Sequence, residues 1–229
     1  MADAGRASGR ILMVAENWPF ASATRRVRQL LADGVLGEPF MLYATHESGL
    51  RLAPLARPDQ GDRARLGYLF AAGIHSLNLA RLLMGEFESI CAFATPAQTA
   101  PDFHLPNEHD MVLAARFAGN RLGSFHFTGR AHRSPRRLAF RLFGTRGTAD
   151  FDILTGAVEW TADEVRTALQ VANPSMGYAE EIAHFVDCVR TGATPITSAD
   201  NQLATLRVVC AAYQSVATGS AVNLAAATA

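Results

Sequence analysis

Two consecutive β-hairpins in the middle of the chain constrain the fold more than any other feature of the sequence. Residues 111–117 and 122–128 alternate apolar and polar side chains around Gly119-Asn120, a dipeptide that favours a tight turn. Residues 137–143 and 148–151 repeat this arrangement around a second Gly-containing turn. Because hairpins join antiparallel neighbours, this region predicts a mostly antiparallel sheet.

The segments around the hairpins supply further strands and several helices. Residues 48–66 and 95–107 lack periodicity and predict loops. Apolar runs or alternation predict strands at 11–16, 39–47, 87–94, 157–160, 165–171 and 221–224. Helical spacing predicts helices at 22–36, 71–85, 178–190 and 199–217, with Ser22 and Ser198 as N-caps. The sum is an α+β fold, in which a mostly antiparallel open sheet carries helices on one face.

Composition excludes several classes of protein. The chain has 229 residues, 49% of them hydrophobic, and a formal net charge of zero, which argues against nucleic-acid binding. No stretch approaches the length of a membrane span, and no signal peptide is visible. The three cysteines lack metal or redox spacing, so we expect reduced thiols and a cytoplasmic protein.

His75 is the candidate catalytic residue, because imidazole moves protons near neutral pH. It stands on the otherwise apolar helix 71–85. The position one helical turn upstream, where a partner could stand, is Ala71, and the chain contains no lysine. The alternative is a buried histidine with a purely structural role.

Several local motifs, in their order and spacing, together resemble the Gfo/Idh/MocA family of nicotinamide-dependent sugar and polyol dehydrogenases. The resemblance is to the C-terminal domain of that family and extends over nearly the whole chain. The motifs are Val14–Asn17 followed by Val35–Glu38, Gly73-Ile74-His75 with Asn78 and Gly85, the Gly144–Gly147 turn, and the closing segments 178–195 and 198–219.

The resemblance implies a nicotinamide cofactor held by an N-terminal Rossmann domain with a Gly-rich turn. This chain has no G-x-G-x-x-G, and ten residues precede Ile11. We therefore expect residues 1–20 to be a remnant of that domain's last helix and strand, 21–224 to be the substrate and oligomerisation domain, and 225–229 to be a disordered tail. NAD(P) is then bound only with a Rossmann partner chain or a longer gene product.

The resemblance also guides the choice of site residues. The family's Glu-Lys-Pro lysine has no counterpart here, and its aspartate position is Ala71. His75 remains as a general acid/base or a hydrogen-bond donor to substrate. We expect Asn17, Trp18, His46, Asn78 and His126 to bind a small-molecule substrate. If His46 and His126 point to the helix side of the sheet, three imidazoles converge; the spacing gives no support for a metal, and we expect none. Glu108-His109-Asp110 is expected to be an exposed turn.

Three functions stay open at this point. The first is an oxidoreductase domain that needs a separate Rossmann chain for redox activity. The second is a cofactor-independent lyase, isomerase or cyclase that uses His75 as acid/base. The third is a non-catalytic module that binds a partner through its sheet. We also expect a homodimer through an apolar sheet face left uncovered by helices, with Phe125, Phe127, Phe140 and Leu142 exposed on it.

Overall fold

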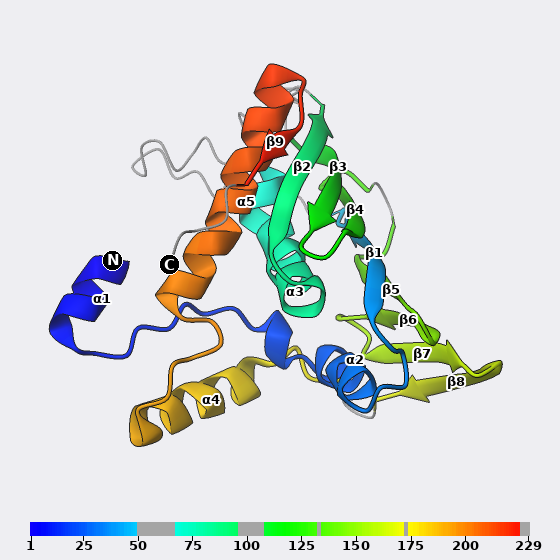
Figure 1. The fold of residues 1–229 in the computed structure, drawn as a ribbon, viewed down its shortest axis with the longest axis horizontal. Coiled ribbons are helices and arrows are strands. Elements are labelled where there is room, and N and C mark those ends of the chain that lie inside the picture. The colour runs from blue at the N-terminus through cyan, green and yellow to red at the C-terminus, as the bar shows by residue number, and fades with distance from the viewer. Residues whose placement is uncertain (50–66, 96–107, 132–133, 172–173, 225–229) are drawn as a thin grey trace.

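One mixed sheet runs along one side of the molecule (Figure 1). The computed structural model describes residues 1–49, 67–95, 108–131, 134–171 and 174–224. Among these residues the strand order is β8-β7-β6-β5-β1-β4-β3-β2-β9. The β1–β4 pair is parallel and its neighbours are antiparallel, which confirms the expected sheet. The strands are β1 (Pro39–Glu47), β2 (Phe87–Ala94), β3 (Asp110–Phe117), β4 (Arg121–Thr128), β5 (Arg137–Gly144), β6 (Gly147–Asp152), β7 (Ala157–Ala162), β8 (Val165–Gln170) and β9 (Val222–Asn223).

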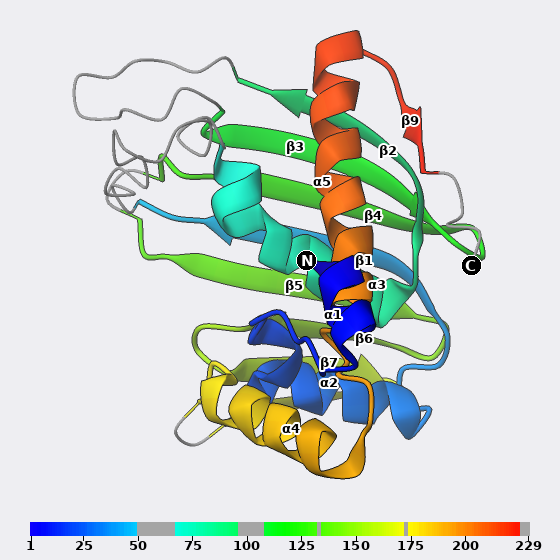
Figure 2. The same ribbon diagram turned by 90° about the vertical axis from the view of Figure 1, so that its left-hand side faces the viewer.

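The helices that contact the sheet cover one of its faces (Figures 1 and 2). Helix α5 packs on β2, α3 on β1, and α2 on β6 and β7. The predicted α+β fold is therefore confirmed. The helical segments are α1 (Ala2–Ser8), the 3₁₀ turn η1 (Trp18–Phe20), α2 (Ser22–Ala32), the π-helical turn η3 (Leu69–Gly73), α3 (Ile74–Met84), α4 (Tyr178–Thr191) and α5 (Ala199–Thr218).

The helix-covered face of the sheet holds the core. Ala44 lies between Phe125 on β4 and Phe140 on β5, and Leu42 lies opposite Leu142. All of these residues are buried, as is Phe127. The expectation that Phe125, Phe127, Phe140 and Leu142 form an open face is therefore wrong. The alternation separates the two faces of each strand correctly, but the helices cover the face that carries these aromatic side chains.

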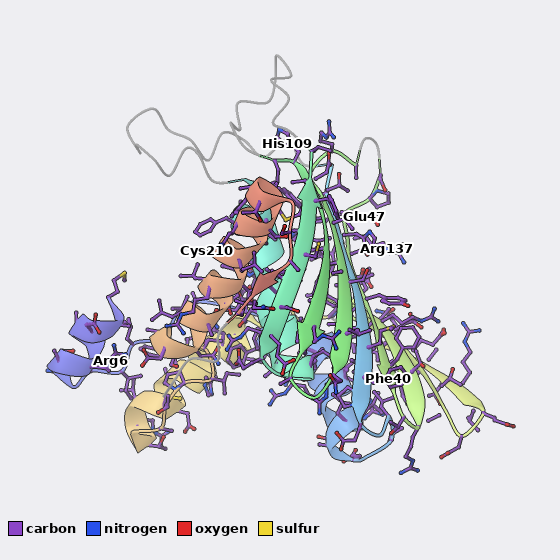
Figure 3. The ribbon with its side chains drawn as sticks, turned by 45° about the horizontal axis from the view of Figure 1, so that its top comes forward. Arg6, Phe40, Glu47, His109, Arg137 and Cys210 are labelled. Atoms are coloured by element: carbon purple, nitrogen blue, oxygen red, sulfur yellow. The ribbon has the colours of Figure 1, made fainter. Side chains whose placement is uncertain are left out.

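The helix-free face carries the other set of alternate residues. Its exposed apolar members include Tyr43, Phe93, Val112 and Leu122. Polar side chains lie among them, and Arg137 stands opposite Glu47 across β1 and β5 (Figure 3). The helix-free face thus carries both apolar and charged side chains, and it is less apolar than the uncovered face that the sequence predicted.

The segment that precedes η1 is not the buried strand predicted at 11–16. Met13 makes one isolated bridge, to Ser198, and Val14 is exposed. No described strand lies alongside the segment to complete a ladder. Ser22 is also not an N-cap, because it is the first residue of α2 and the N-cap position is Ala21, which has no side-chain hydrogen bond to offer. The helix ends at Ala32, four residues before the predicted end.

The burial of two segments also differs from the prediction. Glu108 and His109 are buried, not exposed. On α4, by contrast, Tyr178, Ile182, Val186 and Val189 are all at least half exposed. The predicted bounds of α4 hold, but the stripe at helical spacing does not enter the core of the described structure. Among the described residues, none of the helices combines the length and apolar character needed to cross a bilayer.

The predicted hairpin turn and the predicted cap of α5 agree with the structure, whereas the predicted loops and tail lie mostly outside the described residues. The Gly119-Asn120 turn joins β3 to β4 with positive φ at both residues (77° and 61°), as a tight hairpin turn requires. Ser198 caps α5 by accepting the Asn201 backbone N–H. The predicted loops at 48–66 and 95–107, for most of their length, and the tail at 225–229 lie outside the described residues.

Candidate functional site

His75 sits at the start of α3 and contacts a carboxylate. Its Nδ1 lies 2.6 Å from Oε2 of Glu16, and the two side chains are 31% and 5% exposed. A carboxylate accepts, so Nδ1 donates and the neutral ring keeps its lone pair on Nε2. No described residue bonds to Nε2. The histidine is therefore oriented by an acid on one side and open to a reacting group on the other.

Glu16 is the site residue that the sequence interpretation missed. The position one turn upstream of His75, where helical spacing would place a partner, is Ala71 in η3. The carboxylate comes instead from the segment before η1, 59 positions earlier in the chain. The available signal was a lone acidic residue at the end of the apolar run 11–15. A carboxylate there is costly to bury without a partner, and it has one in His75.

Glu181 of α4 holds the backbone of Glu16. Its Oε1 accepts the Glu16 backbone N–H, and the residue is 4% exposed. Burial raises the pKa of Glu181, and the nearby charge of Glu16 raises it further. Two buried carboxylates and one imidazole thus form the polar centre of the site.

Trp18 packs on a face of the His75 ring. The indole stacks on the His75 ring with centroids 5.2 Å apart and planes 25° apart, and it contacts the His46 ring at 5.5 Å. His46 is 1% exposed, and burial lowers its pKa to about 3, so this ring is neutral. Tyr68 lies edge-on to His46, and burial raises its pKa to about 12. Trp18 and His46, two predicted site residues, therefore line the region beside His75.

The remaining predicted residues make other contacts. Asn17 donates from Nδ2 to the Met176 carbonyl at 2.6 Å, which is a structural contact. His126 lies on the helix-free face, paired with Thr45, whereas His46 pairs with the buried Phe127. The His46 and His126 rings thus point to opposite faces of the sheet, so the condition for three converging imidazoles is not met. Among the described residues, no group of three or more metal-ligating side chains is arranged to hold an ion.

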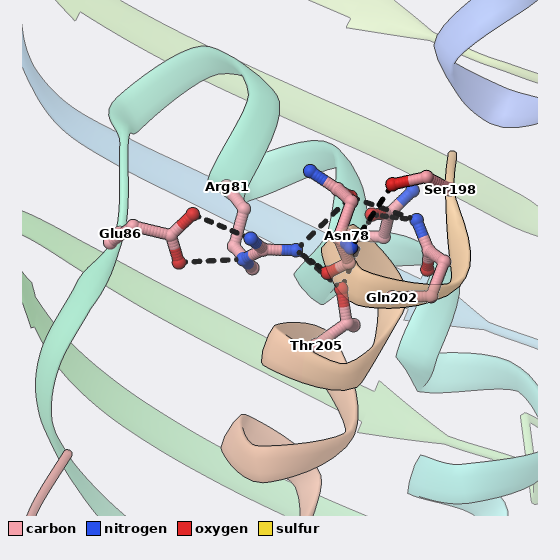
Figure 4. A network of polar contacts seen from close by, with 7 residues as sticks. Asn78, Arg81, Glu86, Ser198, Gln202 and Thr205 are labelled. Carbon is pink, nitrogen blue, oxygen red and sulfur yellow. Dashed lines mark hydrogen bonds and ion pairs between the residues drawn. The ribbon is translucent and has the colours of Figure 1, made fainter. Parts of the chain in front are cut away.

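Asn78 belongs to a network that joins α3 to α5 (Figure 4). Its Oδ1 accepts from Gln202 Nε2 at 2.9 Å and from Thr205 Oγ1 at 3.3 Å. Arg81 donates to the Asn201 carbonyl at 2.7 Å, to Thr205 Oγ1 at 2.9 Å, and to both Glu86 oxygens at 2.9 and 2.5 Å. This network fixes the helix that carries His75, and it engages the Asn78 side-chain oxygen in contacts to α5.

Glu108 holds the start of η3, the turn that precedes α3, by side-chain hydrogen bonds. Glu108 Oε1 accepts the Leu69 backbone N–H at 2.9 Å and the Tyr213 hydroxyl at 3.0 Å. Burial raises the pKa of Glu108. The π-helical turn that leads into α3 therefore begins at a hydrogen bond to a buried carboxylate. This contact helps to hold the N-terminal end of α3, where His75 lies, in place.

Known proteins that resemble this chain are dehydrogenases in sequence and an oxidoreductase in fold. The chain is 26% identical over 232 residues to a D-xylose 1-dehydrogenase (NADP(+)) of Haloferax volcanii, covering 95% of this chain and 66% of that protein. It is 24% identical over 229 residues to a D-apiose dehydrogenase of Rhizobium rhizogenes, covering 94% and 65%. The fold matches an NAD-binding oxidoreductase from Klebsiella pneumoniae with a TM-score of 0.83 at 20% identity, covering 98% of this chain and 69% of that one.

The chain thus spans slightly under two thirds of the length of the curated relatives it matches. The family described as GFO/IDH/MocA C-terminal domain matches residues 24–150, which is more than half of the 229 residues. The protein therefore belongs to the Gfo/Idh/MocA family and carries its C-terminal domain.

Proposed function

We propose that this chain is the substrate-binding part of a sugar or polyol dehydrogenase, with His75 as its acid/base. In the oxidation direction, His75 Nε2 takes the proton of the substrate hydroxyl, and the Glu16 carboxylate stabilises the imidazolium that forms. The observation that carries this proposal is the 2.6 Å contact between Glu16 Oε2 and His75 Nδ1. The D-xylose and D-apiose dehydrogenases among the relatives support an aldose or polyol substrate.

The hydride acceptor has to come from outside the described residues. The residues around His75 supply proton chemistry, and the sequence has no G-x-G-x-x-G turn to hold a dinucleotide pyrophosphate. The described residues therefore do not fit a dinucleotide on their own. We propose that NAD(P) is supplied by a Rossmann domain on a partner chain or a longer gene product.

Two further assignments are part of this proposal. The helix-free sheet face, with Tyr43, Phe93, Val112 and Leu122, would form a homodimer contact. A reducing, cytoplasmic compartment fits Cys91, Cys188 and Cys210, which are free thiols. Light scattering after size-exclusion chromatography tests the dimer: a monomer at micromolar concentration contradicts it.

The test of the main proposal follows the His75 side chain directly. The ¹⁵N-labelled chain is titrated with D-xylose, D-apiose and xylitol, and the imidazole resonances are recorded. We expect a sugar to shift the His75 resonances and leave those of His126 unchanged, because His126 lies on the opposite face. Glu16→Gln should weaken binding or change the His75 response, whereas His126→Gln should do neither.

Two results would redirect the interpretation. Sugar binding that is identical in wild type, His75→Ala and Glu16→Gln would place the substrate elsewhere and overturn the proposal. Conversion of a substrate without any nicotinamide would favour the cofactor-independent lyase, isomerase or cyclase, since the Glu16–His75 pair can move protons without a hydride acceptor.

A further inference from the structure

The segment that delivers Glu16 to His75 has little support from the sheet. Met13 makes a single bridge, and the Val14 N–H donates to the Thr197 carbonyl at 2.9 Å. Val14 and Ala15 are exposed. A carboxylate at the end of such a segment has no ladder to fix its position, so its alignment with the imidazole needs another support.

The N-terminal end of α4 provides that support through side-chain and backbone contacts. Glu181 Oε1 accepts the Glu16 backbone N–H in a short hydrogen bond. One residue further on, Asn17 Nδ2 donates to the Met176 carbonyl at 2.6 Å. At the far end, the Ser22 backbone N–H donates to the Ser175 carbonyl at 3.0 Å. Residues 175–181 therefore hold residues 16–22 at three points.

Gly177 shows how closely the two segments approach. Its φ is +93°, and a Cβ built there would lie 2.3 Å from the Asn17 carbonyl oxygen and 2.7 Å from the Ala21 nitrogen. A side chain at this position would combine left-handed backbone strain with a clash against the backbone of the Glu16 segment. Glycine is thus required for the contact that brings Glu181 over Glu16.

We propose that Glu181 is a positioning residue for the Glu16–His75 pair, and that it acts by accepting the Glu16 N–H and not by its charge. The inference rests on the proposed function of that pair. The hydrogen bond of Glu181 goes to the Glu16 backbone, so Glu181 acts on His75 through Glu16. Without the acceptor, the Glu16 amide loses its partner in a buried place and the carboxylate is free to leave the ring.

Charge and hydrogen bonding can be separated at this position. Glutamine keeps an oxygen acceptor at nearly the same place and removes the charge, whereas methionine keeps the volume and removes the acceptor. Glu180 is a matched control on the same turn of α4, since its carboxylate contacts Arg25 at 3.2 Å and Ser175 Oγ at 2.7 Å instead of Glu16. Glu180→Gln therefore alters the charge of α4 without removing the Glu16 contact.

The readout is the tautomer of neutral His75, measured from imidazole ¹⁵N shifts of the full chain at pH 9. In wild type, Glu181→Gln and Glu180→Gln, we expect the Nδ1–H form to dominate. In Glu181→Met, we expect a mixture of tautomers like that of Glu16→Met, in which the acceptor of the His75 Nδ1–H is removed. A wild-type tautomer in Glu181→Met, or its loss in both Glu181 variants alike, overturns the proposal.

A second measurement needs only the wild-type chain, so it tests the hydrogen bond on which the proposal depends even if Glu181→Met does not fold. The Glu16 amide should exchange with solvent at least about tenfold more slowly than that of exposed Ala15, as a buried hydrogen bond requires. Equal exchange rates overturn the proposal. If wild-type His75 lacks the Nδ1–H tautomer, or Glu16→Met does not change it, the Glu16–His75 pair itself fails. If only Glu181→Met has no effect, the pair stands and this inference fails.

Discussion

Arg81→Met should destabilise the protein strongly although Arg81 touches neither His75 nor Glu16. The guanidinium is 5% exposed and makes charge-assisted hydrogen bonds to α5, at the Asn201 carbonyl and Thr205 Oγ1. Methionine has a similar volume and no donors, so it leaves the Asn201 carbonyl without this partner in the α3–α5 contact. The change therefore tests the polar network while disturbing the packing little.

The size of the effect follows from which partners are buried. Each hydrogen bond from a charged donor contributes about 1.5–3 kcal/mol, and of the two acceptors on α5 Thr205 is buried whereas Asn201 is an exposed residue. The ion pair with Glu86 adds under about 1 kcal/mol, because that carboxylate is 64% exposed and returns to water when Arg81 is removed. Since Thr205 keeps its bond to Asn78, we expect a loss of about 3 kcal/mol in the free energy of unfolding. That loss corresponds to a fall of roughly 6–12 °C in Tm for a chain of this length.

Urea unfolding followed by circular dichroism measures this free energy, with Glu86→Gln as the matched control. The control removes the exposed partner only, so it should cost under about 1 kcal/mol. The reasoning is refuted if Arg81→Met costs no more than Glu86→Gln, because the bonds to α5 would then contribute nothing measurable.

Two other predictions concern pH and the sheet. The folded pKa of Glu181 is raised, so its contribution to stability is present at low pH and is lost as pH rises from its unfolded value of about 4.5 through the folded value. Glu181→Gln should flatten this decline in urea unfolding measured from pH 4 to 8, and a parallel decline in both proteins would contradict the assignment. Phe140→Ala should cost about 3–5 kcal/mol, because this ring is 3% exposed and stacks on Phe151 at 5.0 Å. Tyr43→Ala, on the helix-free face, should cost about 1 kcal/mol or less, and equal costs would mean that the buried face is wrongly assigned.

The sequence predicts the elements well where local chemistry decides them. The bounds of β1 and β2 agree with the alternation at 39–47 and 87–94, and Ser198 caps α5 as predicted. Alternation cannot say which face the helices cover, so Phe140 was assigned to the wrong one. Likewise, the apolar residues Ile182 and Val186 on α4 have helical spacing, yet both are exposed. Spacing predicts the helix but does not show which part of the molecule packs against its apolar side.

The candidate site was predictable only in part, for a similar reason. His75, Trp18 and His46 carry local signals, and the structure brings them together. Glu16 and Glu181 reach the site from segments that are distant in sequence. Their positions depend on how α4 packs against the segment before η1, and no periodicity within either segment encodes that contact.

The place of β1 in the sheet has a consequence for how the chain folds. Ala44 pairs with Phe125 and Phe140, which lie roughly 80 to 100 positions later in the chain. The hairpins β3–β4 and β5–β6 close short loops, so they can form early, whereas β1 must wait until both partners exist. Until β1 arrives, β4 and β5 present unpaired edges that can join the strands of other chains. Insertion of β1 is therefore the step at which folding competes with aggregation, and a nascent chain has to pass residue 144 before that step can finish.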